Sequence, residues 1–146
     1  MFSLNERLQA DTCPVTDLEL CRVLLMNNRL WPWLILVPMR EGAVEIHRLA
    51  EEDQATLMRE IALASRVVER LFAPDKMNVG ALGNMVPQLH VHVIGRTRGD
   101  PAWPGPVWGA GHAEPYEPAE AEALAQRLAD ALLADTLPAD TLRVED

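Results

Sequence analysis

The sequence predicts an antiparallel α+β domain, and three observations support this class. Short strand-like runs follow one another without the regular helical crossovers that a parallel sheet requires. Two longer segments, one in the middle of the chain and one near the C-terminus, carry apolar residues at helical spacing. The length of 146 residues is that of one domain, so we expect 1–146 to form a single unit.

The first part of the chain is predicted to hold a short helix and two strands. Ser3 and Glu6 have the spacing of a capping box, which predicts a helix start there. Residues 20–26 (LCRVLLM) are predicted to form a strand and 27–29 (NNR) a turn, because asparagine tolerates left-handed backbone angles. Residues 33–37 (WLILV) predict a strand that is buried on both faces and closed by the proline that follows.

The clearest helix is predicted over 51–72. Its stripe at helical spacing includes one serine and consists of Leu57, Ile61, Ser65, Val68 and Phe72. Three acidic residues open the segment, where they complement the helix macrodipole. Ala50 stands at the cap position although alanine caps poorly, and Pro74 ends the helix.

The C-terminal half is predicted to add two strands, a loop and a helix. Residues 77–82 and 89–94 are the expected third and fourth strands. Residues 96–116 are rich in Gly, Pro and Trp, which predicts a long ordered loop of the kind that often carries function. Pro118 is expected to start a last helix, and the tail after Pro138 to fray. The stripe of that helix consists of Leu124, Leu128 and Leu132.

Charge and cysteine content bound the function classes. The net charge of −9 argues against broad binding to nucleic acid or to anionic membranes. Cys13 and Cys21 form no CxxC pair and no disulfide framework, which is typical of reduced thiols in an intracellular protein. The N-terminus lacks the apolar stretch of a signal peptide, and the longest nearly apolar run, 30–39, is too short to span a bilayer. We therefore expect a cytoplasmic protein.

The stretch QLHVHV, residues 88–93, carries the most chemistry. Residues two apart in a strand face the same way, so Gln88, His90 and His92 are expected to share one face at intervals of about 7 Å. The alternating apolar residues are expected to pack into the core on the other face. A row of costly polar groups on a buried strand needs an explanation.

Three explanations remain open at this point. The histidines can be structural strand residues with hydrogen-bond partners. They can ligate a metal, although His47, His112 or a distant acid would have to complete the ligand set. A neutral imidazole can also attack phosphorus, provided that an acceptor holds its second ring N–H and donors face the phosphate oxygens. Backbone carbonyls beside the strand suit the first task, and Asn84, His92 and amides of the Gly83 loop suit the second.

The motif and two upstream blocks resemble the histidine-triad (HIT) superfamily. That family carries His-x-His-x-His-x-x on a strand, and QLHVHVI matches it except at the first position. The blocks WLILVPMREGAVEIHRLAEED and MNVGALGN resemble the segments that precede the motif in the family. The resemblance covers a motif-bearing core of about 20–96, followed by a C-terminal loop and helix at 97–137, and it implies a HIT-like fold.

The resemblance implies roles for individual residues. His90 matches the nucleophile that attacks the α-phosphate, and His92 matches the residue that supports that phosphate. Asn84 matches an amide side chain near the phosphates, and Asn78 a further asparagine of the nucleotide site. Asn27 stands near the place of an acidic residue that binds ribose hydroxyls.

Two residues depart from the family pattern. Gln88 replaces the first histidine, whose backbone carbonyl is thought to accept from the nucleophile; a backbone contact survives a change of side chain. Trp33 stands where many members have another histidine, and its indole suits either core packing or a wall of the nucleobase pocket. Trp103 and Trp108 of the long loop either close over the site or pack against the core. Arg40 and Arg96 are further candidates for phosphate contacts, as many surface arginines would be.

The resemblance implies a nucleotide hydrolase or transferase with a nucleotidyl-histidine intermediate. A dinucleoside polyphosphate or a nucleoside phosphoramidate fits as substrate. No tightly bound cofactor is expected, although magnesium can accompany the substrate, and a homodimer is implied. The alternative is a nucleotide-binding module with weak or no turnover, because two of the usual histidines are replaced.

Overall fold

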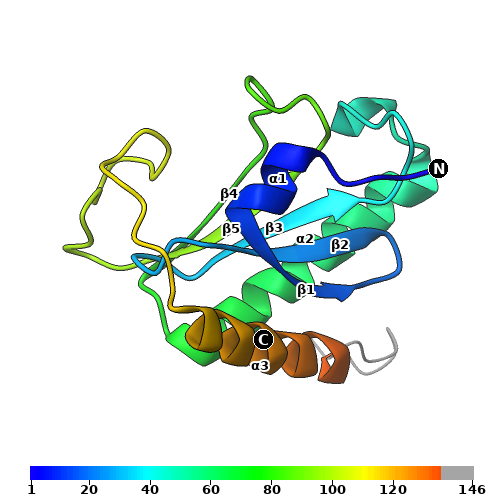
Figure 1. Cartoon of the computed structure of the whole chain (residues 1–146). Coiled ribbons are helices and arrows are strands. Elements are labelled where there is room, and N and C mark those ends of the chain that lie inside the picture. The colour runs from blue at the N-terminus through cyan, green and yellow to red at the C-terminus, as the bar shows by residue number, and fades with distance from the viewer. Residues whose placement is uncertain (136–146) are drawn as a thin grey trace, which may run out of the picture.

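A computed structural model describes residues 1–135 as one antiparallel sheet with helices on both faces (Figure 1). The sheet has five strands in the order β1-β2-β3-β5-β4, and every neighbouring pair is antiparallel. The elements in chain order are α1 (Glu6–Asp11), β1 (Thr12–Asp17), β2 (Cys21–Met26), β3 (Trp33–Pro38), the 3-10 helix η1 (Ile46–Arg48), α2 (Glu51–Phe72), β4 (Lys76–Gly80), β5 (Val91–Arg96) and α3 (Pro118–Ala134). The predicted antiparallel α+β class is confirmed.

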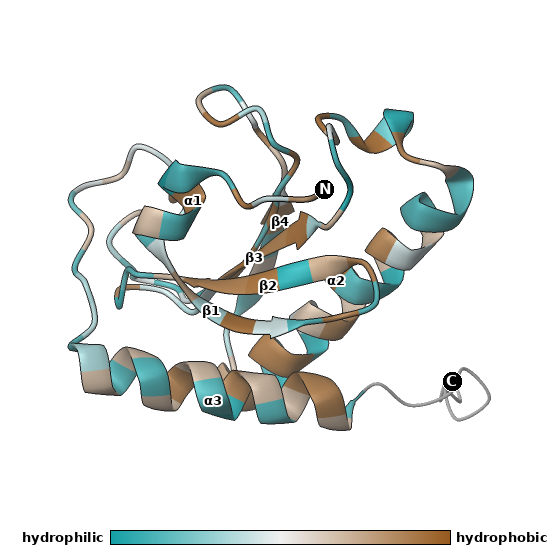
Figure 2. Cartoon of the chain, turned by 45° about the vertical axis from the view of Figure 1, so that its right-hand side comes forward, coloured by the Kyte–Doolittle hydropathy of each residue, from teal (hydrophilic) through white to brown (hydrophobic). Residues whose placement is uncertain are grey.

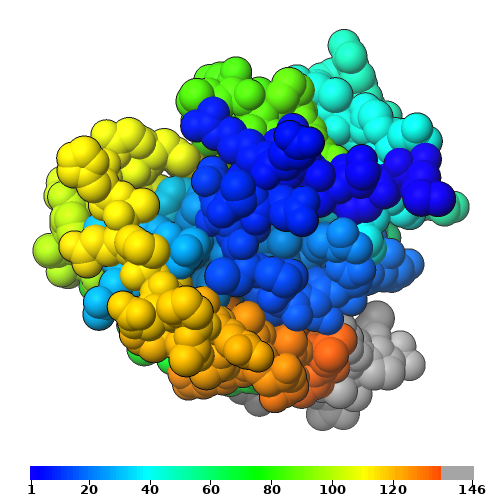
Figure 3. All heavy atoms as spheres, in the orientation of Figure 1, coloured from blue at the N-terminus to red at the C-terminus, as the bar shows by residue number. Residues whose placement is uncertain are grey.

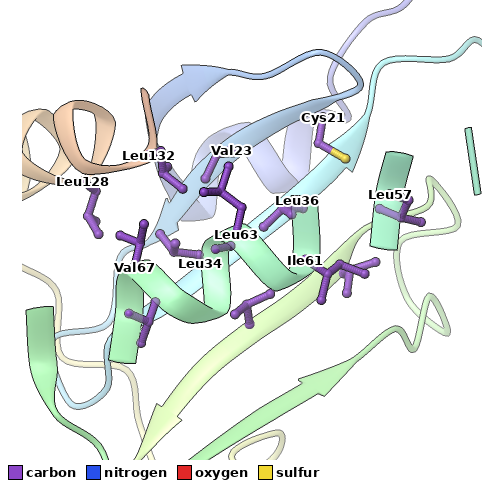
Figure 4. Close-up of a cluster of buried hydrophobic side chains, with 14 of the residues drawn as sticks. Cys21, Val23, Leu34, Leu36, Leu57, Ile61, Leu63, Val67, Leu128 and Leu132 are labelled. Atoms are coloured by element: carbon purple, nitrogen blue, oxygen red, sulfur yellow. The ribbon is translucent and has the colours of Figure 1, made fainter. Parts of the chain in front are cut away.

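The larger core lies between one face of the sheet and the two long helices. Figure 4 shows side chains of β2 and β3 interleaved with those of α2 and α3. Three of the predicted stripe residues of α2 (Leu57, Ile61, Val68) and two of α3 (Leu128, Leu132) are buried there. Burial of such side chains stabilises by roughly 1.5–3 kcal/mol each, which is why both helices hold their predicted positions.

The opposite face of the sheet is covered by the N-terminal segment and by part of the loop 97–117. Its core consists of Leu8, Leu24, Trp31, Trp33, Ile35, Val37, Val86, Ile94 and Val107. β3 is buried along its whole length because it contributes to both cores, and Figure 2 shows it in brown. The strand β5 lies beside it, so the residues of β5 alternate between the two cores.

The structure corrects several predicted details. The side chain of Asn5, and not Ser3, caps α1 by accepting from the backbone N–H of Arg7 at 2.9 Å. The strand β1 was not predicted, because its residues include a proline and two threonines without clear alternation. β4 lies one to two residues earlier than predicted, and β5 begins at Val91 instead of at residue 89. The predicted tail after Pro138 lies outside the described residues. No helix in the described part of the chain is long and apolar enough to cross a membrane.

Candidate active site

Two histidines lie together where the chain enters β5. His90 immediately precedes the strand and His92 is its second residue. Their ring centroids are 5.0 Å apart in an edge-on arrangement, and only 7% and 6% of their surfaces are exposed. His92 faces the smaller core together with Ile94, while Val91 and Val93 face the helices. The predicted pair of imidazoles on one face is therefore present.

His90 is oriented by a backbone carbonyl. Its Nδ1 lies 2.7 Å from the carbonyl oxygen of Gln88. A carbonyl oxygen can only accept a hydrogen bond, so Nδ1 must carry the hydrogen. The neutral ring then has its free lone pair on Nε2, and a histidine can act as a nucleophile only through such a nitrogen. Nε2 forms no hydrogen bond within residues 1–135 and is not among the fully buried atoms.

The side chain of Gln88 binds the N-terminal segment, and within residues 1–135 it forms no hydrogen bond with either histidine. Its amide oxygen accepts from the backbone N–H of Asn5 at 2.8 Å, and its amide nitrogen donates to the carbonyl of Ser3 at 2.9 Å. Figure 3 shows the N-terminal segment lying against the loop that precedes β5. Gln88 therefore contributes its carbonyl to the site and its side chain to the fold.

His92 is held by an indole and shielded by another. The Nε1 of Trp33 donates to Nδ1 of His92 at 3.0 Å. The ring of Trp108, from the loop 97–117, lies edge-on at 5.2 Å from the His92 ring. Burial, and after it the positive charge of a protonated His90, lowers the pKa of His92 to about 4. His92 is thus neutral at physiological pH.

Trp33 belongs to the core and not to the wall of a pocket. Only 6% of its surface is exposed, and Trp31 packs edge-on against it at a centroid distance of 6.3 Å. The structure thus places Trp33 against the ring of His92. Its predicted alternative of core packing is the one that the structure supports.

A pocket of about 380 Å³ opens beside His90. Its lining includes His47 of η1, Glu45 before it, and Gly83 of the loop between β4 and β5. Gly83 has a φ of +73°, a left-handed backbone that favours glycine and turns the loop at this point. The size is within the range of small-ligand sites. His47 is exposed, and the sequence suggested it only as a residue that could complete a metal ligand set.

The three predicted asparagines have different surroundings. Asn84 is exposed, one residue beyond Gly83. Asn78 accepts from the guanidinium of Arg96 at 2.8 Å. Asn27 accepts from the backbone N–H of Tyr116 at 2.9 Å and lines a separate pocket with it. Among the described residues, no hydrogen bond or shared pocket links Asn27 or Asn78 to the two histidines.

Both arginines that the sequence suggests for phosphate contacts are paired with carboxylates. Arg96 is 1% exposed and pairs with Asp100, and Arg40 pairs with Asp53 through two hydrogen bonds of 2.8 and 3.0 Å. Within residues 1–135 no group of three or more His, Cys, Asp or Glu side chains is arranged to hold a metal ion. The chemistry of the described site therefore centres on the imidazoles.

The comparisons with known proteins decide the family. A model of the HIT domain matches residues 7–99. A solved histidine triad protein from Marinobacter aquaeolei VT8 is 50% identical, with a TM-score of 0.88, and the match covers 94% of this chain and 99% of that one. This chain belongs to the HIT family.

Two further solved HIT proteins are similar along nearly their whole length. The one from Sinorhizobium meliloti 1021 is 49% identical, with a TM-score of 0.86 over 89% of this chain and 96% of that one. The one from Bradyrhizobium japonicum is 44% identical, with a TM-score of 0.84 over 93% and 98%. No curated protein matches the chain. Membership in the HIT family supports a nucleotide-binding or nucleotide-hydrolysing role in general terms.

Trp108, which the sequence left as either a cover of the site or a core residue, contacts His92 in this HIT protein. Its ring approaches Gly80 of β4 so closely that a Cβ at Gly80 would lie 3.1 Å from it. Gly80 is also the register partner of His92. A glycine in β4 and a tryptophan some 28 positions later show no relation in the sequence, because only the pairing of β4 with β5 brings them together.

Proposed function

We propose that this HIT protein is a nucleotide hydrolase or nucleotidyl transferase that forms a nucleotidyl-histidine intermediate on His90. The observation that carries the proposal is the 2.7 Å contact between Nδ1 of His90 and the carbonyl oxygen of Gln88. It directs the lone pair of the ring toward Nε2, which has no partner within the described residues. Nε2 is also not among the fully buried atoms, so a substrate can reach it.

The proposed reaction has two displacements. The Nε2 lone pair of His90 attacks the α-phosphorus, and the bond from phosphorus to the leaving group breaks with its electron pair going to that group. Water then attacks the same phosphorus, the N–P bond breaks, and the electron pair returns to Nε2. One proton of the water goes to solvent or to the leaving group, and the hydroxyl remains on the mononucleotide. Transfer to another nucleophile follows the same balance.

Donors around the phosphate are proposed to come from the chain's neutral groups. His92 lies beside His90, and the loop with Gly83 and Asn84 borders the same pocket. Since both candidate arginines are paired with carboxylates, the negative charge of the substrate needs another partner. We propose that magnesium enters with the substrate, because it neutralises polyphosphate oxygens without a dedicated protein cage.

A turnover assay tests the proposal. Purified protein is incubated with a diadenosine polyphosphate and with an adenosine phosphoramidate, each with and without magnesium, and release of mononucleotide is followed. We expect turnover that is lost in His90→Ala and kept in His112→Ala, because His112 is an exposed histidine of the loop. Wild-type rates no higher than those of His90→Ala on every nucleotide tested would contradict the enzymatic function.

The alternative is a HIT module that binds nucleotides with weak or no turnover. It is favoured by the replacement of two imidazoles by Gln88 and Trp33 and by the low pKa of His92, which withholds a proton donor. Equilibrium binding of a mononucleotide that equals the wild-type affinity in His90→Ala, together with no turnover, would support this alternative.

A homodimer and a cytoplasmic location complete the proposal. A second copy is suggested by the family resemblance, and β4 is an edge strand of the sheet. Sedimentation at micromolar concentration that gives a single 16.2 kDa species would contradict the homodimer.

A further inference from the structure

Trp33 makes one polar contact that has a chemical consequence for its partner. Its indole nitrogen lies 3.0 Å from Nδ1 of His92. An indole N–H can donate but never accept, so Nδ1 of His92 must offer a lone pair. A neutral His92 therefore carries its hydrogen on Nε2, and a protonated His92 would place two N–H groups against each other.

We propose that Trp33 is a positioning residue that fixes His92 as a neutral imidazole with its hydrogen on Nε2, where it donates to a phosphoryl oxygen but does not supply a proton. The catalytic role given to His92 in this inference rests on the proposed function. The hydrogen-bond assignment itself rests only on the contact and on the burial of both side chains, which are each 6% exposed.

The neighbouring ring has the opposite arrangement. A carbonyl holds Nδ1 of His90 and an indole N–H holds Nδ1 of His92. One Nε2 therefore presents a lone pair and the other presents a hydrogen, on two rings whose centroids are 5.0 Å apart. A phosphoryl group needs both, because a nucleophile attacks phosphorus while a donor binds a non-bridging oxygen. The Trp33 contact supplies this complementarity without any charged side chain.

The surroundings of His92 keep it neutral. Trp33 and Ile35 face it from β3, Gly80 is its partner in β4, and Trp108 covers it from the loop. None of these groups ionises. The only charge within the described residues that acts on the ring is that of His90, which opposes protonation. Burial acts in the same direction, and the lowered pKa of about 4 agrees with the geometry.

The leaving group is constrained by this arrangement. A nucleoside polyphosphate departs as an anion and needs no proton, whereas an amine must be protonated as the P–N bond breaks. With His92 fixed as a donor that keeps its hydrogen, the site favours the phosphoanhydride. His47 lines the same pocket and is exposed, so it is the other histidine that can deliver a proton to an amine.

Nitrogen-detected NMR of protein labelled with ¹⁵N-histidine tests the assignment directly. The His92 signals are identified by their loss in His92→Gln. We expect them to show the Nε2–H form at pH 7 and a neutral ring until the pH falls to about 4. Wild-type His92 in the Nδ1–H form, or charged at pH 6, would overturn the proposal. This readout needs no substrate, so it stands or falls separately from the enzymatic function.

Two tryptophan variants extend the test. In Trp33→Phe, which keeps an aromatic ring but lacks the donor, the pKa of His92 should rise and a mixture of tautomers should appear, with kcat lowered about 10-fold or more and KM little changed. Trp31→Phe is the matched control, because Trp31 is equally buried but is not paired with His92. Trp33→His offers a donor again and serves if Trp33→Phe fails to fold. Unchanged His92 signals in a folded Trp33→Phe would overturn the proposal.

The substrate preference is measured on the same proteins. We expect wild-type kcat/KM for diadenosine tetraphosphate to exceed that for an adenosine phosphoramidate by about 100-fold or more, since His92 does not supply the proton that the departing amine needs. His47→Gln should lower the phosphoramidate rate by a larger factor than the diadenosine tetraphosphate rate. A wild-type preference for the phosphoramidate that survives His47→Gln would contradict the assignment of His92 as a donor that keeps its hydrogen.

Discussion

The two ends of β5 carry polar side chains that the fold treats in opposite ways. At the C-terminal end the guanidinium of Arg96, 1% exposed, donates to both oxygens of Asp100 at 2.8 and 3.0 Å and to Asn78 at 2.8 Å. The carboxylate of Asp100 also accepts from the backbone N–H groups of Ala102 and Trp103. At the N-terminal end, His90 and His92 each have one nitrogen held and one without a partner in residues 1–135.

The difference separates a structural cluster from a reactive one. Buried polar groups that only stabilise a fold are satisfied, because an unpaired one costs about 1–3 kcal/mol. Arg96 and Asp100 follow this rule and fasten the start of the loop 97–117 to the sheet. Each histidine keeps one ring nitrogen without a partner in residues 1–135, and neither nitrogen is fully buried, so both are open to a ligand. Their unpaired nitrogens are therefore the groups that a ligand is expected to use.

The largest expected effect comes from His90→Ala. It removes the nucleophile, so kcat/KM should fall by about 1,000-fold or more. The free energy of unfolding should change by only about 1 kcal/mol, because the ring makes a single local hydrogen bond. Steady-state kinetics and urea denaturation on the same preparation measure both. A loss of unfolding free energy large enough to account for the whole loss of activity would mean that His90 is structural, like Arg96.

At the other end of β5, Arg96→Met is expected to lower stability strongly and activity little. It leaves the Asp100 carboxylate, 3% exposed, without its partner and should destabilise by about 3–5 kcal/mol. The rate per folded molecule should stay near that of the wild type.

The matched control is Arg22→Met, which breaks a pair of the same two-bond geometry with Asp17 on the surface. That change should cost about 1 kcal/mol or less. Similar losses in the two variants, by urea denaturation, would mean that burial of the Arg96 pair does not matter.

The two ends should also respond to different ranges of pH. The folded pKa of His92 is lowered from 6.5 to about 4, so the unfolded chain binds more protons between these values. This contribution of His92 to stability is complete above pH 6.5, and about 3 kcal/mol should be lost as the pH drops from 6.5 to 4. Arg96 holds the pKa of Asp100 well below its ordinary value of 3.8, so that contribution is lost only at lower pH.

Thermal unfolding across the acid range, compared with His92→Gln, measures the histidine contribution. In the variant, the unfolding temperature should depend less on pH between 6.5 and 4, and its fall at lower pH should be unchanged. Identical curves for the two proteins would show that His92 is not the group that titrates.

The smallest expected effect is that of Gln88→Ala. It removes the two hydrogen bonds to the N-terminal segment and should cost about 1–2 kcal/mol of stability. The carbonyl that orients His90 remains, so kcat should change by about 3-fold at most. A loss of activity as large as that of His90→Ala would show that the amide of Gln88 acts in the chemistry itself.

The sequence was most informative where the signal is local. Helix α2 has the predicted bounds, and β2, β3 and the stripe of α3 follow from periodic burial. The pair of histidines and the use of the Gln88 carbonyl also follow from a short motif. A strand such as β1, by contrast, is stabilised mainly by pairing with β2 and by packing against other elements, which composition does not reveal.

The partners of the site residues depend on distant segments. Trp33 reaches His92 across 59 positions, and Gln88 reaches Ser3 across 85. Asn27 binds the backbone of Tyr116 across 89 positions. Such hydrogen bonds arise from strand register and loop placement, so a residue type alone cannot say whether an asparagine or a tryptophan faces a ligand or the chain itself.

The central claim is that Nε2 of His90 becomes covalently bonded to phosphorus. The most direct measurement is the stereochemical course at the α-phosphorus, followed with a chiral α-phosphorothioate dinucleotide hydrolysed in ¹⁸O-water. Two displacements, one by His90 and one by water, predict retention of configuration. Inversion would mean that water attacks directly, and it would contradict the role assigned to His90.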